Sequence, residues 1–262
     1  SLFDAFCHSF STIATGGFST KNNSIAHYQS PYIQWVIIIF MFASGVNFSL
    51  YFILLHGTLT DFRQKIRDFF SDEEFRAYFI MVASSTLIMV LALSLHGMYS
   101  GPEDTLRRVC FHVVSVMTTT GFVVEDYNLW PEVTKFIFLI LMFTGASGGS
   151  TGGGCKVSRV LILSRKLKAE VGRLLHPRAV ITPRLNGQPI LQGTLDSSGA
   201  FFVLYMLFFV ISTLITTAFD VDVLTAFTGV LTCLSNVGPG LNALGPIENF
   251  ANLPDAVKWL FS

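Results

Sequence analysis

Three short segments of the chain end in the same combination of hydroxyl, amide and glycine residues. They read HSFSTIATGGF at residues 8–18, HVVSVMTTTGF at residues 112–122 and GVLTCLSNVGP at residues 229–239. Alignment on the last glycine pairs Gly17 with Gly121 and Gly238, His8 with His112, Ser11 with Ser115 and Thr232, and Thr15 with Thr119 and Asn236. A repeated element of this kind predicts several equivalent structures around one axis.

Segments of this type could bind a dehydrated cation. Glycine permits backbone angles that other residues avoid, and threonine and asparagine add hydroxyl and amide oxygens. A ring of such segments can aim carbonyl oxygens at an ion and so replace its hydration shell. The simpler interpretation makes each glycine a turn between a helix and a loop. Three copies, each placed between two long apolar stretches, favour the ring.

The composition is that of a membrane protein. Of the 262 residues, 51% are hydrophobic and only 13% are charged, against roughly 25% charged residues in a soluble domain. Phenylalanine alone contributes 26 residues. The formal net charge is zero, so no bulk attraction to nucleic acid is expected.

Long and short apolar stretches alternate along the chain. A bilayer span needs about 20 apolar residues, and such stretches run from Tyr32 to about His56, from about Ala77 to Met98, from near Val133 to a break at Gly145, from Ser198 to Phe219, and onward from near Ala256. Stretches of only about 11–13 residues suit re-entrant helices, and these are Leu2–Thr12, Thr105–Met117 and Val223–Leu234. An acid near each start suits the helix dipole: Asp4, Asp104 and Asp222.

The repeating unit is therefore a span, a re-entrant helix, the glycine motif and a second span, with a period of about 100–120 residues. We predict an all-α membrane protein whose units surround one pore with pseudo-fourfold symmetry. The first unit lacks its leading span, the last lacks most of its closing span, and no signal peptide is visible. We therefore expect the sequence to be a piece of a longer membrane protein.

Charge predicts the orientation in the membrane. Basic residues gather in two linkers between units, at Arg63, Lys65, Arg67 and Arg76, and at Arg159, Arg165, Lys166, Lys168, Arg173, Arg178 and Arg184. Acidic residues flank the glycine motifs instead, at Glu103, Asp104, Glu125, Asp126, Glu132, Asp220, Asp222 and Glu248. The positive-inside rule places the linkers in the cytoplasm, and the acids on the external face would attract cations. The second linker also contains prolines and an Asn186-Gly187 pair, which indicate a loop or hairpin.

A second glycine-rich feature, GASGGSTGGG, interrupts an apolar stretch. Its residues are Gly145, Ala146, Ser147, Gly148, Gly149, Ser150, Thr151, Gly152, Gly153 and Gly154. So many glycines disfavour a helix. A flexible linker is the simpler interpretation, but the run has no charge and apolar sequence on both sides, which favours an unwound intramembrane loop that gates or binds. Lys156 and Arg159 follow; they could hold the loop, repel cations, or mark the inner interface by snorkelling.

Other reactive residue types show no catalytic pattern. Cys7, Cys110, Cys155 and Cys233 form no CxxC pair and suit small buried thiols. The six histidines lack metal-ligand spacing, and the register of His8 with His112 suggests packing or a helix start. No Ser/His or acid pair recurs with catalytic spacing, and GASGG does not fit a nucleophile elbow.

The ordered set of motifs resembles a known family. ATGGF (Ala14–Phe18), TTTGF (Thr118–Phe122), SNVGPG (Ser235–Gly240) and the GASGGSTGGG run are similar to the pore loops and broken span of the Trk/Ktr/HKT superfamily of potassium transporters, and within it to the bacterial TrkH-type potassium uptake subunit. The resemblance covers essentially the whole chain, as units two to four. It implies residues 1–60 as the pore loop and second span of unit two, 61–76 as a cytoplasmic linker, 77–176 as unit three, 177–197 as a second linker, and 198–262 as unit four, truncated in its second span.

The resemblance implies a potassium-selective transport protein, not an enzyme, with a simplified K⁺-channel-like filter. K⁺ would bind along Thr15, Gly16, Gly17, Thr119, Thr120, Gly121, Asn236, Val237 and Gly238, mainly through backbone carbonyls. The loop 145–154 would be the gate, with Lys156 and Arg159 in control of charge. Family members are homodimers with one pore per protomer, in lipid of the bacterial inner membrane, and bind a cytosolic nucleotide-binding ring of the TrkA type. K⁺ is the transported ion, and no organic cofactor is implied.

A different class of function is also open. In an alternating-access secondary transporter for cations, the loop 145–154 would be the binding site and the three glycine motifs would be passive. Deletion within the loop separates the two hypotheses. Removal of a gate raises ion flux, whereas removal of a binding site abolishes it.

Overall fold

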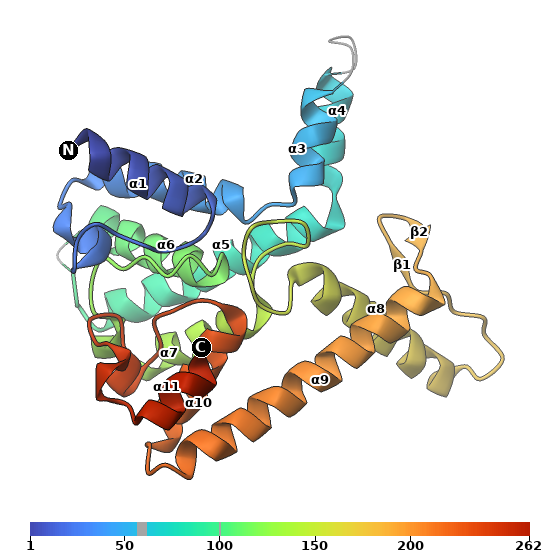
Figure 1. The fold of residues 1–262 in the computed structure, drawn as a ribbon. Helices are drawn as coiled ribbons and strands as arrows, with labels where there is room; N and C mark the ends of the chain where they lie inside the picture. The colour runs from blue at the N-terminus through green and yellow to red at the C-terminus, as the bar shows by residue number, and fades with distance from the viewer. Residues whose placement is uncertain (57–61, 100) are drawn as a thin grey trace.

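The computed structural model describes residues 1–56, 62–99 and 101–262, and it is mostly helical (Figure 1). Two of its helices, α5 (Glu73–Leu95) and α9 (Gln192–Thr217), are long and apolar enough to cross a membrane. Both leave most of their surface facing outward. A helix that is apolar on its outward faces is suited to lipid, because lipid imposes no cost on exposed apolar side chains. These two helices confirm the predicted spans that begin near Ala77 and Ser198.

Three short helices follow the predicted re-entrant stretches closely. They are α1 (Leu2–Ile13), α6 (Pro102–Met117) and α10 (Val223–Ser235). Each begins at a recognisable start signal: a capping box between Ser1 and Asp4, a proline at the first position of α6, and the Asp222 side chain, which accepts two backbone N–H groups of α10. At 12, 16 and 13 residues they are too short to span a bilayer.

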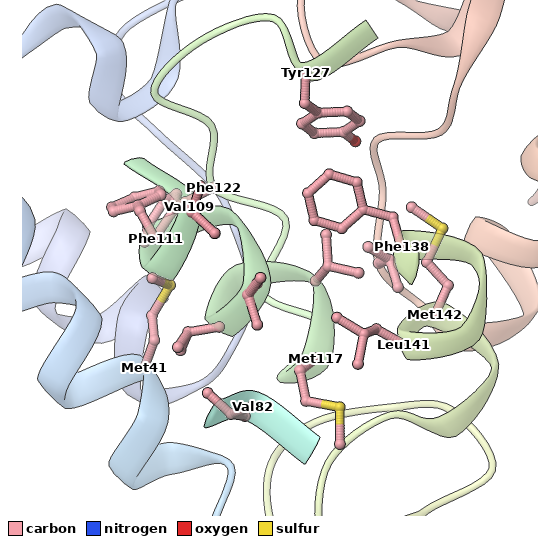
Figure 2. Packing of buried hydrophobic residues seen from close by; sticks show 14 of the residues in the cluster. Met41, Val82, Val109, Phe111, Met117, Phe122, Tyr127, Phe138, Leu141 and Met142 are labelled. Atoms are coloured by element: carbon pink, nitrogen blue, oxygen red, sulfur yellow. The ribbon is translucent and has the colours of Figure 1, made fainter. Parts of the chain in front are cut away.

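Helix α6 lies at the centre of the packing. It contacts α5, α2 (Pro31–Ser44) and α7 (Glu132–Thr144), while α9 packs along α10. Figure 2 shows the resulting core, to which four helices contribute the buried side chains Met41, Val82, Phe111, Met117, Phe138 and Met142. Burial of α6 on several sides explains why its C-terminal half, VCFHVVSVM, is apolar except for His112 and Ser115 instead of having a single apolar stripe.

The apolar stretch from Tyr32 to about His56, predicted as one span, forms two helices that only together are long and apolar enough to cross a membrane. These helices are α2 and α3 (Phe48–Leu55), which meet at 91°. Gly45 stands at the break, where a Cβ would lie 2.5 Å from the Tyr78 hydroxyl of α5 and 2.7 Å from a methyl group of Thr118. The side chain of Asn47 then caps α3 by accepting the N–H of Ser49 at 2.9 Å. Close approach of α5 and α6, together with this cap, ends α2 within an apolar sequence.

The predicted break at Gly145 is confirmed. Helix α7 ends at Thr144, and α8 (Val157–Leu175) begins after the glycine-rich loop (residues 145–154). Three backbone hydrogen bonds close the base of this loop, from Cys155 to Phe143 at 3.3 Å, from Lys156 to Thr144 at 2.8 Å, and from Val157 to Ala146 at 3.0 Å. We call these three bonds the neck. They keep the two ends of the loop side by side.

The linkers fold into structure of their own. Helix α4 (Phe62–Ser71) packs on α3, and residues 184–189 form a hairpin of strands β1 (Arg184–Leu185) and β2 (Gln188–Pro189). The turn residues Asn186 and Gly187 have φ of 50° and 74°, as a two-residue hairpin turn requires. The predicted hairpin is thus confirmed. We call α4, α8 and this hairpin the basic side.

The opposite side consists of loops and short helices. The 3-10 helices η1, η3, η4 and η5 and the final helix α11 cover it, with bounds Ser24–His27, Tyr127–Leu129, Asn242–Leu244, Phe250–Asn252 and Asp255–Phe261. Helix α11 coincides with the start of the last predicted apolar stretch. We call this the acidic side.

Three of the acids on this side form ion pairs with arginine, which the sequence did not predict. Arg107 of α6 is only 6% exposed and forms ion pairs with Glu103 and Asp104. Arg108 pairs with Asp104 and with Glu125, which follows the second glycine motif. Attraction of cations by these three acids is therefore weaker than their number suggests, because two buried or half-buried guanidinium groups offset it.

Candidate functional site

The three glycine-ended tripeptides, residues 15–17, 119–121 and 236–238, share one unusual backbone conformation. In each, the first and last residues have positive φ and the middle residue does not. The angles are 50° and 69° at Thr15 and Gly17, 56° and 78° at Thr119 and Gly121, and 59° and 97° at Asn236 and Gly238. Non-glycine residues rarely adopt positive φ, so its recurrence at three aligned positions shows that the sequence repeat is a structural repeat.

The tripeptides also leave their helices by the same hydrogen bond. In each case the N–H of the middle residue donates to the carbonyl oxygen five residues earlier, from Gly16 to Ser11 at 2.8 Å, from Thr120 to Ser115 at 2.9 Å, and from Val237 to Thr232 at 2.8 Å. The accepting residues are the aligned Ser/Ser/Thr set of the sequence repeat. This bond fixes each tripeptide directly beyond the C-terminal end of α1, α6 or α10, where the helix dipole is negative.

Neighbouring tripeptides stand in contact. A Cβ on Gly17 would overlap the carbonyl oxygen of Thr120, and a Cβ on Gly121 would overlap the carbonyl oxygen of Val237. A Cβ on Gly238 would meet nothing within 4 Å among the described residues. The three tripeptides therefore lie side by side in chain order, and glycine is required at the first two by space as well as by backbone angle.

Two aligned histidines support the segments that follow the tripeptides. His112 is fully buried in the middle of α6; its Nδ1 donates to the Arg108 carbonyl at 2.9 Å, and its Nε2 accepts the N–H of Val124 at 3.4 Å. His8 in α1 bonds the Asp4 carbonyl at 2.6 Å and Ser19 Oγ at 2.9 Å. The predicted packing role is confirmed, whereas a helix-start role is wrong because both lie within their helices.

Replacement of His112 by phenylalanine is expected to lower stability by about 1–3 kcal/mol, because an aromatic ring is kept while the buried N–H of Val124 loses its acceptor. Thermal unfolding of the detergent-purified protein measures the loss. His96→Phe is the matched control, since His96 is exposed at the end of α5. Equal melting temperatures for H112F and H96F would show that the two ring hydrogen bonds contribute nothing.

The glycine-rich loop lies against the C-terminal ends of all three short helices. The loop residues and their neighbours are Thr151 with Ile13, Gly152 with Thr118, and Gly153 with Thr119 and Ser235. The Thr151 hydroxyl donates to the Ile13 carbonyl at 3.1 Å. A Cβ on Gly153 would overlap the Ser235 carbonyl oxygen. The loop thus crosses the same point at which the three tripeptides begin, and its glycines allow this approach.

Residues 147–149 of the loop form hydrogen bonds with residues that the sequence did not predict as part of the site. The N–H of Ser147 donates to the Gly45 carbonyl at 3.0 Å, and the N–H of Phe48 donates to the Gly149 carbonyl at 3.1 Å. The N–H of Gly148 donates to the carboxylate of Glu74 at 2.5 Å. Glu74 was assigned to the linker 61–76; an acid beside the start of a long apolar helix was the available signal.

Lys156 and Arg159 turn back toward the protein. The Lys156 ammonium donates to the carbonyl oxygen of Gly152 within the loop. The Arg159 guanidinium donates to the Cys155 carbonyl at 3.2 Å and lies 4.1 Å from the ring centroid of Phe201 on α9. Among the alternatives left open by the sequence, these contacts support holding of the loop.

A half-buried chain of hydrogen bonds stabilises the acidic side near the second tripeptide. The Trp130 indole donates to the Tyr99 hydroxyl at 3.0 Å, and Tyr99 donates to Glu125. Burial, together with the adjacent Glu125 carboxylate, raises the pKa of Tyr99. Tyr99 therefore stays a neutral donor at physiological pH, and Glu125 stays fixed near the end of its segment.

The amino-acid sequence matches the family model of the TrkH cation transport protein over residues 1–262. The Trk system potassium uptake protein TrkH of Salmonella typhimurium (strain LT2) is 38% identical over 258 residues, covering 98% of this chain and 52% of that protein. The Trk system potassium uptake protein TrkG of Escherichia coli (strain K12) is 34% identical over 260 residues, covering 99% and 52%.

The fold matches that of a solved relative. The crystal structure of the potassium transporter TrkH from Vibrio parahaemolyticus superposes with a TM-score of 0.90 at 36% identity, covering 100% of this chain and 55% of that chain. The chain spans about half the length of these relatives. The predicted all-α membrane fold and the resemblance are thereby confirmed, and the chain belongs to the TrkH family of cation transport proteins.

Proposed function

We propose that the protein conducts K⁺ across a membrane along an axis lined by the three tripeptides, and that it is not an enzyme. The observation that carries the proposal is the shared left-handed geometry of three tripeptides that stand in contact at three helix ends. Carbonyl oxygens of the nine residues would take the place of water around the ion. The relatives named above are potassium transporters and uptake proteins by name.

The electrostatics of the site suit a cation. Helices α1, α6 and α10 end at the tripeptides, so their partly negative C-terminal ends face the proposed ion path. No acid lies within any of the three tripeptides. Neutral carbonyl oxygens hold an ion weakly enough to release it again, and conduction requires both entry and release.

The glycine-rich loop is proposed as the gate of this path. It crosses the helix ends where the tripeptides begin, and the Lys156 ammonium is bonded to it. A loop in this place blocks an ion that has passed the tripeptides, and a cationic group beside it adds electrostatic repulsion. For the loop to leave the path, the 2.6 Å hydrogen bond from the Gly153 N–H to the Thr119 hydroxyl must break.

The setting of the protein is proposed from the same resemblance. We expect a homodimer with one pore per protomer in the bacterial inner membrane, regulated from the cytosol by a nucleotide-binding subunit of the TrkA type. The outward apolar surfaces of α5 and α9 support contact with lipid. The positive-inside rule then places the basic side in the cytoplasm.

The proposal predicts that the full-length gene product restores growth at limiting potassium to a bacterium without its own potassium uptake systems. Uptake of Rb⁺, which substitutes for K⁺, measures the flux directly. The empty vector is the control, and a strain that also lacks the regulatory subunit tests the proposed partner. If the protein reaches the membrane with the regulator present and Rb⁺ uptake equals that of the vector, the proposed function is wrong.

A further inference from the structure

The start of α5 carries three consecutive acids that bind three different parts of the protein. Asp72 and Glu73 contact the hairpin turn, Glu73 also pairs with α8, and Glu74 contacts the glycine-rich loop. Asp72 is the N-cap, and the other two begin the helix. All three lie within one helical turn, so a single rigid element fixes these parts relative to one another.

Glu74 is the acid nearest the proposed gate. Its side chain is buried at 8% exposure, and its carboxylate accepts the N–H of Gly148 at 2.5 Å and Nδ2 of Asn47 at 3.5 Å. A buried carboxylate is costly unless it is hydrogen-bonded. Charge-assisted bonds are roughly twice as strong as neutral ones, so the bond to Gly148 is a strong restraint on the loop.

Asn47 connects the same point to the other broken span. Its Nδ2 donates to Glu74, while its Oδ1 caps α3 and would lie 2.8 Å from a Cβ on Gly149. Asn47 thereby lies between the α2–α3 break and the loop. Both breaks, one in each second span, meet at the Glu74 carboxylate.

The hairpin turn holds the start of α5 from the basic side. Asn186 donates through Nδ2 to Asp72 at 2.6 Å and through its backbone N–H to Glu73 at 3.2 Å, and its Oδ1 accepts the N–H of Glu73 at 2.8 Å. Arg165 of α8 adds an ion pair with Glu73 at 2.8 Å. The hairpin turn is therefore tied by three hydrogen bonds to the residues immediately before Glu74.

We propose that the start of α5 is the anchor of the gate: Glu74 is a positioning residue that holds the glycine-rich loop across the helix ends, and Asn186 holds Glu74 in place from the hairpin. This inference rests on the proposed gating role of residues 145–154. A displacement of the hairpin reaches the loop through two adjacent residues of one helix. A movement of the hairpin on the cytoplasmic side thus moves the gate.

The test measures Rb⁺ uptake by the full-length gene product with Glu74→Gln, Asn186→Ala and both changes together. Glutamine keeps the shape of glutamate but removes its charge. Its amide nitrogen also places an N–H donor opposite the donor Nδ2 of Asn47. E74Q should therefore raise flux at least about fivefold, which is the low end of typical coupling between sites. N186A should raise flux less, and the double variant should equal E74Q, because residues in one chain of contacts are not additive. K⁺ over Na⁺ preference should stay unchanged in all three.

Glu132→Gln is the matched control, since Glu132, like Glu74, lies in the first turn of an apolar helix, but its side chain is 87% exposed. Unchanged flux in both E74Q and N186A, or strictly multiplicative effects, would overturn the anchor. Should E74Q fail to reach the membrane, N186A alone decides, because Asn186 is exposed on the hairpin. Deletion within the loop distinguishes a failure of the anchor from a failure of the gate. If the deletion raises flux while E74Q and N186A do not, only the anchor is refuted. If the deletion abolishes flux, the proposed gate is refuted.

Discussion

Replacement of Gly121 by valine is expected to reduce K⁺ over Na⁺ selectivity about tenfold or more, since strain of about 1–3 kcal/mol is typical at a positive φ and each 1.4 kcal/mol is a factor of ten. Gly121 has φ of 78°, which a β-branched residue tolerates poorly. Its Cβ would overlap the Val237 carbonyl oxygen and lie 3.1 Å from Pro239. The substitution therefore displaces two proposed ion-binding segments at once. Competition between Rb⁺ and Na⁺ during uptake measures the effect.

Gly97→Val is the control for this prediction. Gly97 also has a positive φ, 61°, but a Cβ there would meet nothing within 4 Å among the described residues. The two variants share the backbone strain and differ in the clash with a neighbouring tripeptide. If G121V transports with the selectivity of G97V at equal abundance in the membrane, the assignment of residues 119–121 to the ion path fails.

Deletion of residues 147–152 is expected to raise K⁺ flux at least about tenfold, equivalent to a shift of about 1.4 kcal/mol toward the open state. The deletion removes Thr151 and Gly152, which contact the ends of α1 and α6. The shortened chain can close because Gly145 and Gly153 already lie against each other. Initial rates of Rb⁺ uptake at saturating Rb⁺ provide the measurement.

The same deletion tests the alternating-access alternative, under which the loop binds the transported ion. In that case, flux would fall to the level of the empty vector instead of rising. Thr213→Ala serves as a control, because Thr213 lies on α9 and, among the described residues, its hydroxyl donates to the Phe209 carbonyl of its own helix alone. Unchanged flux in the deletion variant would mean that the loop neither blocks nor binds.

The helices were largely predictable from sequence because length and start signals decide them locally. The apolar stretches of α1, α6 and α10 end in motifs that contain glycine, which tolerates positive φ, and Asp4, Asp104 and Asp222 mark their starts. The starts of α5 and α9 were placed four to six residues too late, at Ala77 and Ser198 instead of Glu73 and Gln192. A search for apolar residues misses a polar first turn, because such a turn extends the helix beyond its apolar part.

What the sequence could not predict are the contacts between distant segments. The bend after Ser44 depends on the approach of Tyr78 and Thr118 to Gly45, and a single glycine in an apolar run does not specify it. The partnership of Glu74 with Gly148 joins residues 74 positions apart. The repeat aligned Gly17, Gly121 and Gly238, but their order of contact became evident only from the folded backbone.

The neck at the base of the glycine-rich loop affects how fast the proposed gate can open. Its three backbone bonds, from Cys155, Lys156 and Val157, join the end of α7 to the start of α8 and need not break when the loop moves. The bonds from the loop to Glu74, Gly45 and Thr119 must break instead, so the motion is a lid opening on the microsecond-to-second scale and leaves both helices wound. Ion flux should accordingly rise only gently on warming, without the steep increase that accompanies the unwinding of a helix.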